Sequence, residues 1–261
     1  MASPTYAVRA LVLRKTKLGE GDLIVSLLAE DGSARRVVAK GARKPSSAFS
    51  SRLELCSEVD LLCAKGRSLD VVKEARLVDA HATLRGDLER SAAAACMCEL
   101  LERTVQDELV IERLFPMTSA ALTALEEAPA ASAAAITAAH LLKTLAFIGF
   151  RPSFDRCVGC GAPVSLEAPA MPFSALEGGV VCPACARELQ TVRASGPALA
   201  FALGLLRARF ADLATEGASA RANVEVLHLI DALVVAHVGA RLKSLRFFLT
   251  AGLDLDVPAK R

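Results

Sequence analysis

Hydrophobic and polar positions alternate with a period of two in several short runs near the start of the chain. Val8, Ala10 and Val12 form the first run, and similar runs occupy residues 23–29, 34–40, 53–63 and 69–74. This period is typical of β-strands, whose successive side chains point to opposite faces. No helical pattern strong enough for a βαβ unit lies between the runs. Five short strands within residues 1–79 therefore predict a small closed barrel of the OB type, with an SH3-like barrel as the main alternative.

Turn residues separate the predicted strands. Residues 18–22 read Leu-Gly-Glu-Gly-Asp, and residues 65–68 read Lys-Gly-Arg-Ser. Asp31-Gly32 is the strongest hairpin signal, because this pair readily takes the positive φ angles of a type I′ turn. Residues 41–51 predict a loop, since they contain glycine, proline and four serines.

After residue 79 the hydrophobic period becomes helical. Met97, Leu101, Val105 and Leu109 recur every four residues and predict a helix that Pro116 closes or directly follows. The remaining pattern predicts helices at residues 118–127, 132–148, 198–213 and 224–249. Composition agrees, because 53% of residues are hydrophobic and only 4% are aromatic, which favours close-packed, alanine-rich helices. The prediction is a multidomain α+β protein in which a helical domain, residues 80–155 and 188–261, follows the barrel.

Four cysteines interrupt the helical part. Cys157, Cys160, Cys182 and Cys185 form two Cys-x-x-Cys pairs separated by twenty-one residues. This spacing predicts one tetrahedral zinc ion per chain, in a module of residues 156–187 inserted between helices. Four thiolates leave no position for a catalytic water, so the metal is expected to be structural. Two disulfides or four unligated thiols are the alternatives.

The other four cysteines, Cys56, Cys63, Cys96 and Cys98, are expected to be small buried hydrophobic residues. Disulfides would require an oxidising compartment, and no export signal is recognisable, so a cytoplasmic protein is expected. No run of eighteen uncharged apolar residues occurs, and we therefore predict no membrane span.

Basic residues gather near the start of the chain, although the formal net charge is only +2. Residues 1–52 hold ten Lys or Arg against four Asp or Glu. Such clusters neutralise phosphates, and an OB barrel commonly presents its second and third strands to single-stranded nucleic acid. The predicted DNA-binding residues are Arg14, Lys15, Arg35, Arg36, Lys40, Arg43, Lys44 and Arg52. A solvated basic face is the alternative. Only Tyr6 and Phe49 supply aromatic rings here, so backbone contacts should exceed base stacking.

Enzyme signatures are missing from the sequence. Residues 19–24 imitate the opening of a dinucleotide-binding fingerprint but lack its third glycine. His228 and His237 are nine residues apart on one predicted helix and therefore lie on opposite sides of it. We expect a protein without catalytic residues.

Two segments and the cysteines together resemble the bacterial RecO family of DNA repair proteins. The segments are Leu-Gly-Glu-Gly-Asp at residues 18–22 and Val-Ala-Lys-Gly-Ala-Arg-Lys-Pro at residues 38–45, and both precede the four-cysteine module. The resemblance covers nearly the whole chain. It implies an OB fold, a helical domain and a zinc module, with binding of single- and double-stranded DNA and annealing of complementary strands. It also implies RecR and single-strand-binding protein as partners, and RecA indirectly.

The acidic, apolar tail of single-strand-binding protein requires a hydrophobic groove rimmed by cations. Residues 140–150 and 224–249 are the helices expected to form it, with Arg241, Lys243 and Arg246 as candidate partner-binding residues. The alternative is that the apolar residues pack the core and the cations cap a helix C-terminus. A second functional reading is a zinc-stabilised protein-interaction adaptor with no direct role on DNA.

Overall fold

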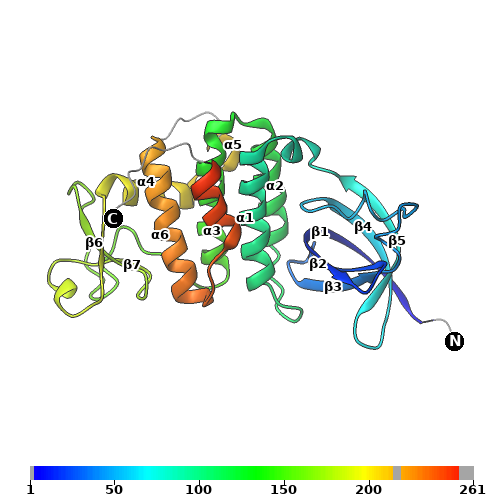
Figure 1. The fold of residues 1–261 in the computed structure, drawn as a ribbon. Helices are drawn as coiled ribbons and strands as arrows, with labels where there is room; N and C mark the ends of the chain where they lie inside the picture. Colours follow the sequence, from blue (N-terminus) through cyan, green and yellow to red (C-terminus); the bar gives the residue numbers. More distant parts are fainter. Residues whose placement is uncertain (1–2, 214–218, 253–261) are drawn as a thin grey trace.

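The computed structural model describes residues 3–213 and 219–252. Three parts follow one another along the molecule (Figure 1). A β-barrel lies at one end, a bundle of helices occupies the middle, and a small sheet with long loops forms the other end. This is the predicted α+β architecture.

The barrel is closed by five strands in the order β1-β2-β3-β5-β4. Their bounds are β1 (Thr5–Leu18), β2 (Asp22–Ala29), β3 (Ala34–Ala39), β4 (Glu58–Ala64) and β5 (Asp70–Asp79). All neighbouring pairs are antiparallel except β3 and β5. The structure therefore confirms the five-stranded closed barrel.

The hairpin predicted at Asp31-Gly32 is confirmed, because β2 and β3 pair antiparallel on either side of it. Two local details of the barrel prediction were wrong. The Asp31-Gly32 turn is not of type I′, because Gly32 has φ +82° whereas Asp31 does not have a positive φ. The Asp31 carboxylate instead accepts hydrogen bonds from the backbone N–H and the hydroxyl of Ser33, which fixes a longer loop. The fourth strand begins at Glu58 instead of residue 53, because Cys56 takes a left-handed conformation with φ 65° and turns the chain.

Strand β1 is buried on both faces over Ala10–Leu13. Ala10 and Val12 point into the barrel core, whereas Leu11 and Leu13 belong to the core of the helical domain. Leu28 on β2 joins them there. The outer face of β1 and β2 is thus partly covered by the helices, so the barrel and the helical domain share an apolar interface.

The helical domain is organised around α3 (Ala133–Phe147). The other helices are α1 (Leu88–Thr104), α2 (Leu114–Glu127), α4 (Gly196–Arg207), α5 (Phe210–Leu213), α6 (Ala220–Val238) and α7 (Lys243–Phe247). Helices α1, α2, α4 and α6 all pack against α3. By length and composition residues 130–147 are apolar enough to cross a membrane, with a mean hydropathy of 1.3, but 72% of this segment is buried inside the molecule.

Several predicted helix boundaries were wrong. Helix α1 ends at Thr104, before Leu109, and Pro116 lies in the first turn of α2, where its missing N–H removes no helical hydrogen bond. The helix predicted at residues 198–213 breaks after Arg207 into α4 and α5. The last helix breaks at Gly239, which has φ +73°. Gly149, with φ +98°, ends α3 as predicted.

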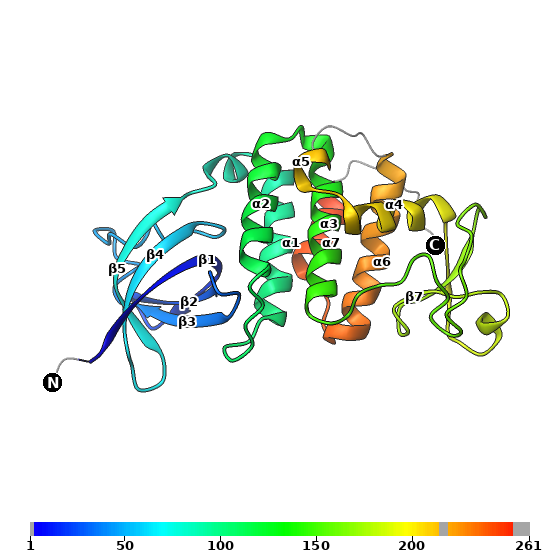
Figure 2. The ribbon, with the colours of Figure 1, turned by 180° about the vertical axis from the view of Figure 1, so that it is seen from behind.

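The third part is a three-stranded sheet in the order β7-β6-β8. It comprises β6 (Met171–Ser174), β7 (Gly179–Val180) and β8 (Val192–Ala194), and it lies beyond α4 and α6 at the end opposite the barrel (Figure 2). Phe154 and Phe173 stack with ring centroids 6.2 Å apart and belong to the helical core. The small sheet is therefore joined to the helices by apolar packing.

Candidate metal centre and nucleic-acid interface

The four cysteines of the small sheet converge on one point. The Sγ atoms of Cys157, Cys160, Cys182 and Cys185 all lie within 4.8 Å of one another. The Sγ atoms of Cys160 and Cys182 are 3.8 Å apart. Four sulfur atoms placed tetrahedrally at the zinc–sulfur distance of about 2.3 Å would also be about 3.8 Å apart. The donor set and its spacing therefore fit a zinc ion.

The backbone around the cysteines is shaped for thiolates. The backbone N–H of Cys182 donates to Cys157 Sγ at 3.2 Å. A Cβ atom at Gly159 would lie only 3.1 Å from Cys185 Sγ, so any larger residue here would crowd the cluster. Gly161 has φ +75° and donates its N–H to the carbonyl of Cys157 at 2.8 Å. These features close both Cys-x-x-Cys turns around one centre.

The pKa values of the Cys157 and Cys185 thiols differ widely. Burial opposes ionisation of Cys157, but hydrogen bonds from the backbone amides of Cys182, Cys160 and Gly159 outweigh it and lower its pKa to about 6. The neighbouring thiols of Cys182 and Cys160 raise the pKa of Cys185 to about 12. Four thiolates repel one another at this spacing, so full ionisation of the cluster requires a cation.

The remaining four cysteines are buried, as predicted. Cys63 lies in the barrel core and Cys96 in α1, and burial raises their pKa values to about 11 and about 12 respectively. The Sγ atoms of Cys56 and Cys98 lie 3.3 Å apart across the interface between barrel and helices. None of these four belongs to the metal cluster.

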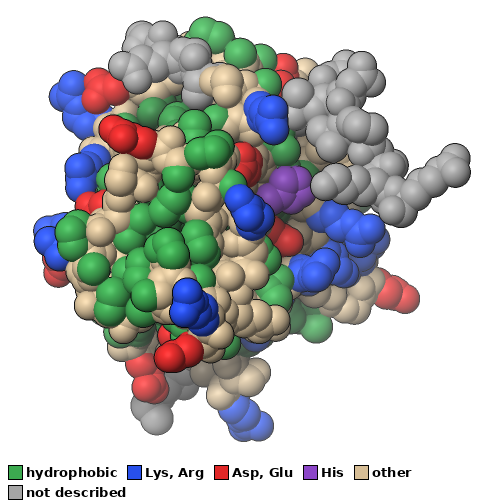
Figure 3. Space-filling view, turned by 90° about the vertical axis from the view of Figure 1, so that its left-hand side faces the viewer, with side chains coloured by type: hydrophobic (Ala, Val, Ile, Leu, Met, Phe, Trp, Pro, Cys, Tyr) green, Lys and Arg blue, Asp and Glu red, His purple; other side chains and the backbone are tan. Residues whose placement is uncertain are grey.

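Viewed from the end that carries the cysteine module, the surface has a largely hydrophobic centre (Figure 3). Lys and Arg side chains are scattered over the described part of this face, with carboxylates between them. Leu176, on the module, and Val192, on β8 of the same sheet, are 62% and 56% exposed. Among the described residues, this end of the molecule therefore shows no concentration of cations of the kind that a phosphate backbone requires.

The opposite end carries a cluster of cations built on two interlocked turns. The carboxylate of Asp22 accepts a hydrogen bond from the backbone N–H of Gly41 at 2.7 Å. Arg43 donates its backbone N–H to the carbonyl of Gly21 and its guanidinium to the carbonyl of Gly19. The two segments that carry the family resemblance are thus packed together, and they hold Lys40, Arg43 and Lys44 exposed at one end of the barrel.

Two further predicted cations share one row across the barrel. Arg14 on β1 pairs in register with Ser26 on β2, and Ser26 pairs with Arg36 on β3. Cross-strand neighbours project to the same face, and both arginines are exposed. Arg14 also forms an ion pair of 3.4 Å with Glu102 on α1. This row lies beside the part of the barrel face that the helices cover.

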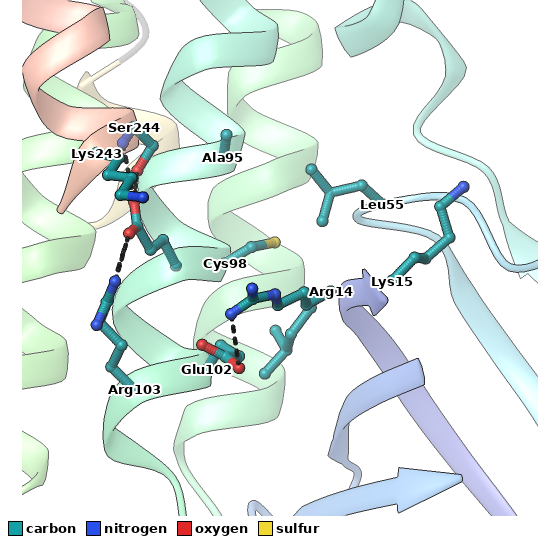
Figure 4. Close-up of a pocket in the computed structure, with 11 residues that line it drawn as sticks. Arg14, Lys15, Leu55, Ala95, Cys98, Glu102, Arg103, Lys243 and Ser244 are labelled. Atoms are coloured by element: carbon teal, nitrogen blue, oxygen red, sulfur yellow. Dashed lines mark hydrogen bonds and ion pairs between the residues drawn. The ribbon is translucent and has the colours of Figure 1, made fainter. Parts of the chain in front are cut away.

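A cavity of about 430 Å³ opens between the barrel and the helices (Figure 4). Arg14 and Lys15 reach it from β1, and Lys243 reaches it from the start of α7. Lys15 forms a 2.5 Å ion pair with Glu54. The structure therefore brings Lys243, predicted to bind a partner, together with two residues predicted to bind DNA.

The other predicted residues are dispersed. Arg35 is half-buried, with an ion pair to Asp31 and a hydrogen bond to the carbonyl of Asp107. Arg52 donates to the carbonyl of Ala75 on β5. Arg241 and Arg246 are exposed on either side of the start of α7.

Between residues 140–150 and 224–249, where a groove is predicted, the structure has a cavity of only about 220 Å³, lined by Ile148, Phe150, His237 and Val238 among others. Leu141 and Leu145 are fully buried and pack in the helical core. Because the last helix breaks at Gly239, Lys243 lies at the N-terminus of the short helix α7 and does not cap a helix C-terminus. The backbone N–H and the hydroxyl of Ser244 donate to Glu99, which supplies the capping carboxylate there.

Sequence reasoning missed Lys65 as a candidate contact. Its Nζ atom lies 4.6 Å from the ring centroid of Tyr6, beside Arg35 and Arg36 in a cavity of about 520 Å³. The Lys-Gly-Arg-Ser turn at residues 65–68 was the available signal, since it adds two cations to the barrel. It was interpreted only as a strand connection.

Comparison with known proteins agrees with this arrangement. A family model described as Recombination protein O N terminal matches residues 1–81, and one described as Recombination protein O C terminal matches residues 85–246. The DNA repair protein RecO of a Nocardioides species is 34% identical over 248 residues, covering 93% of this chain and 98% of the relative. That of Symbiobacterium thermophilum is 32% identical over 248 residues, covering 93% and 96%. That of Frankia casuarinae is 40% identical over 189 residues, covering 70% and 74%.

Proposed function

The chain belongs to the RecO family of DNA repair proteins, and from this premise we propose that it is a non-catalytic recombination mediator. In this role it binds single- and double-stranded DNA and anneals complementary strands. It helps to load the recombinase RecA onto DNA coated by single-strand-binding protein, with RecR and the tail of that coating protein as direct partners. The proposal places the protein in the cytoplasm, at the nucleoid.

One observation carries the DNA-binding part of the proposal. Lys40, Arg43 and Lys44 are exposed side by side on a loop whose backbone is tied to the turn at residues 18–22. A fixed cluster of cations at an exposed end of a barrel suits a phosphate backbone, because each neutralised phosphate releases counterions. Contacts of such cations with phosphates carry no sequence information, which favours binding without sequence preference.

A second part of the proposal is that Cys157, Cys160, Cys182 and Cys185 hold one structural zinc ion. The 3.8 Å spacing of Cys160 and Cys182, the amide donated to Cys157 and the close approach of Gly159 to Cys185 all support it. When bound, the ion supplies positive charge that keeps four thiolates together. The protein supplies four thiolates, which fill the coordination shell, and backbone amides such as that of Cys182, which donates to Cys157.

The test of DNA binding is a triple charge reversal. Lys40→Glu, Arg43→Glu and Lys44→Glu together should weaken binding to unrelated oligonucleotides alike, measured by fluorescence anisotropy across a salt series. Each lost phosphate contact should lower the slope of log affinity against log salt by about 0.7 for single strands. The matched control reverses three exposed arginines far from the barrel, Arg187, Arg193 and Arg221, and should retain binding. Normal binding by the first variant would show that the loop is merely a solvated face.

The alternative function is a protein-interaction adaptor. The exposed Leu176 on the cysteine module and Val192 on β8 favour it, because exposed apolar residues suit a protein surface. The salt series separates the two functions, since an adaptor with an incidental basic barrel would show no salt-dependent affinity for DNA.

A further inference from the structure

One aromatic ring lies in a basic cavity at the opposite side of the barrel from the Lys40 loop. The cavity measures about 520 Å³ and is lined by Tyr6 on β1, Arg35 and Arg36 on β3, and Lys65 and Asp70 in and after the β4–β5 turn. Its volume falls in the range of about 300–1,000 Å³ that is typical of ligand pockets. Asp107 lines the cavity as well, so three cations and two carboxylates surround the single tyrosine of the chain.

The tyrosine ring is held in a fixed orientation. Its hydroxyl donates to the Asp70 carboxylate at 2.6 Å, and its inner part packs against the barrel core. Burial and the hydrogen bond to Asp70 raise the pKa of Tyr6, so the hydroxyl stays protonated at neutral pH. A ring that is anchored at its hydroxyl end loses little entropy when a ligand stacks on it.

The other face of the ring is covered only by a solvent-exposed cation. Lys65 Nζ lies 4.6 Å from the ring centroid, while the Lys65 side chain is 60% exposed. Lys65 also forms an ion pair of 3.2 Å with Asp70. Because cation–π contacts and ion pairs of a largely exposed lysine are both weak, a ligand can displace the ammonium from the ring at small cost. The ammonium would then be free to contact a phosphate beside the stacked base.

We propose that Tyr6 is a base-stacking subsite for single-stranded DNA, with Arg36 and Lys65 binding the phosphates that flank the stacked base. This inference rests on the proposed DNA-binding function and adds a specific contact to it. A planar base suits the flat ring face, and the cations suit the sugar–phosphate backbone on either side. An acidic peptide would match the charges, but it would leave the ring face without a planar partner.

The surroundings extend the subsite into a path along the barrel. Arg35, Arg36 and Asp107 also line a second cavity of about 260 Å³, which continues past Ser26 to Glu102. Arg14 shares its cross-strand row with Ser26 and Arg36. A strand stacked on Tyr6 would therefore run along exposed arginines toward the junction with the helices.

The composition of the chain provides a direct probe. Tyr6 is the single tyrosine and there is no tryptophan, so intrinsic emission reports on this ring alone. Titrating the full-length protein with oligo-dT should quench Tyr6 emission, with binding followed in parallel by anisotropy of a labelled strand. Free N-acetyltyrosinamide, titrated in the same way, corrects for light absorbed by the oligonucleotide.

Two variants separate stacking from folding. Tyr6→Leu keeps an apolar side chain against the barrel core but removes the ring face, and it should weaken oligo-dT binding roughly 5- to 150-fold. Tyr6→Phe keeps the ring, loses only the hydroxyl, and should bind within about twofold of the parent. Phe49→Leu, at the other partly buried aromatic of the barrel, should leave affinity unchanged. Circular dichroism and thermal unfolding verify that each variant is folded.

The outcomes distinguish this inference from the function on which it rests. Quenching together with weak binding by folded Tyr6→Leu supports the subsite. Salt-dependent DNA binding without quenching, or with normal affinity in Tyr6→Leu, overturns the subsite and leaves the DNA-binding function standing. No DNA binding by the parent protein overturns both.

Discussion

A single buried imidazole ties the barrel to the helices. His81 lies two residues after the end of β5, and its side chain is 1% exposed. Nδ1 lies 2.7 Å from Glu126 on α2, and Nε2 lies 3.8 Å from Glu58 on β4. Asp79 is 3.9 Å from Nδ1. Burial opposes protonation, but the contacts with Glu58 and Glu126 outweigh it and raise the pKa of His81 to about 9. His81 is therefore a cation held between carboxylates of two domains.

This contact predicts a specific pH dependence of stability. Because the pKa of His81 is about 9 in the folded chain and 6.5 as the ordinary value, protonated His81 stabilises the fold fully below pH 6.5. The contribution is lost as pH rises through 9. His81→Gln should therefore lower the free energy of unfolding by on the order of 3 kcal/mol at pH 6 and progressively less toward pH 10. Urea unfolding at a series of pH values measures the difference.

The control for this experiment is His228→Gln, at an exposed position on α6. It should leave the unfolding free energy unchanged at every pH. His81 has φ 42°, a left-handed conformation that histidine adopts more readily than glutamine, so a constant penalty is also expected in His81→Gln. Only the part that varies with pH tests the ion pairs, and a difference that is constant from pH 6 to pH 10 would contradict them.

At the scale of helices, ends are capped by side chains from other helices. Lys143 on α3 donates from Nζ to the carbonyls of Leu205, Leu206 and Ala208, at 2.8 to 3.1 Å. These carbonyls belong to the end of α4, where positive charge is favoured. The lysine thereby fixes the break between α4 and α5. A contiguous helix over residues 198–213 would satisfy these carbonyls internally.

Removing this cap should be costly. Lys143→Met keeps the length of the side chain but leaves three carbonyls without their donor, so the unfolding free energy should fall by roughly 2–3 kcal/mol. Denaturant unfolding followed by circular dichroism measures the loss. Lys243→Met, at an exposed position on α7, is the matched control and should change stability by less than about 0.5 kcal/mol. Equal stability of the two variants would refute the capping role.

At the scale of the whole molecule, the cysteine module and the barrel lie at opposite ends of the helical domain (Figure 1). Phe154, Phe173 and Val180 of the module belong to the helical core, and so do Leu11 and Leu28 of the barrel. The barrel also has an interior core of its own. Loss of the module should therefore disturb the adjoining helices before it disturbs the barrel.

Zinc removal tests this order. Chelation under reducing conditions, or Cys160→Ser, should raise hydrogen exchange in residues 153–194 and in α4 and α6, while β1–β5 keep their protection. DNA affinity should stay within about threefold of the parent if the barrel holds the binding site. Metal analysis of natively purified protein should give one zinc per chain. Absence of zinc, or loss of DNA binding with every element still folded, would contradict a purely structural metal.

The sequence by itself determined the local elements and the cysteine cluster. A period of two over residues 6–75 sufficed for five strands, because side chains on a pleated strand alternate between faces whatever the tertiary context. Two Cys-x-x-Cys pairs sufficed for the cluster, because each pair turns within four residues and brings its own thiols together. The presence of helices was also predictable from the local sequence, but the positions of their ends were not.

Tertiary structure alone decided where the elements stop and which surfaces remain open. Helix α4 ends because Lys143, more than fifty residues away, holds its carbonyls, and no pattern near residue 207 signals this. Leu11 and Leu13 are buried because helices cover the outer face of β1, whereas alternation alone would expose them. The predicted cations lie in three places: an exposed end of the barrel, a row across neighbouring strands, and the junction with the helices. Barrel closure decides which strands are neighbours, and the distance between residues along the sequence does not show this. Charge composition identified the basic barrel, but only the packing of β4 against β1 placed Lys65 over the ring of Tyr6.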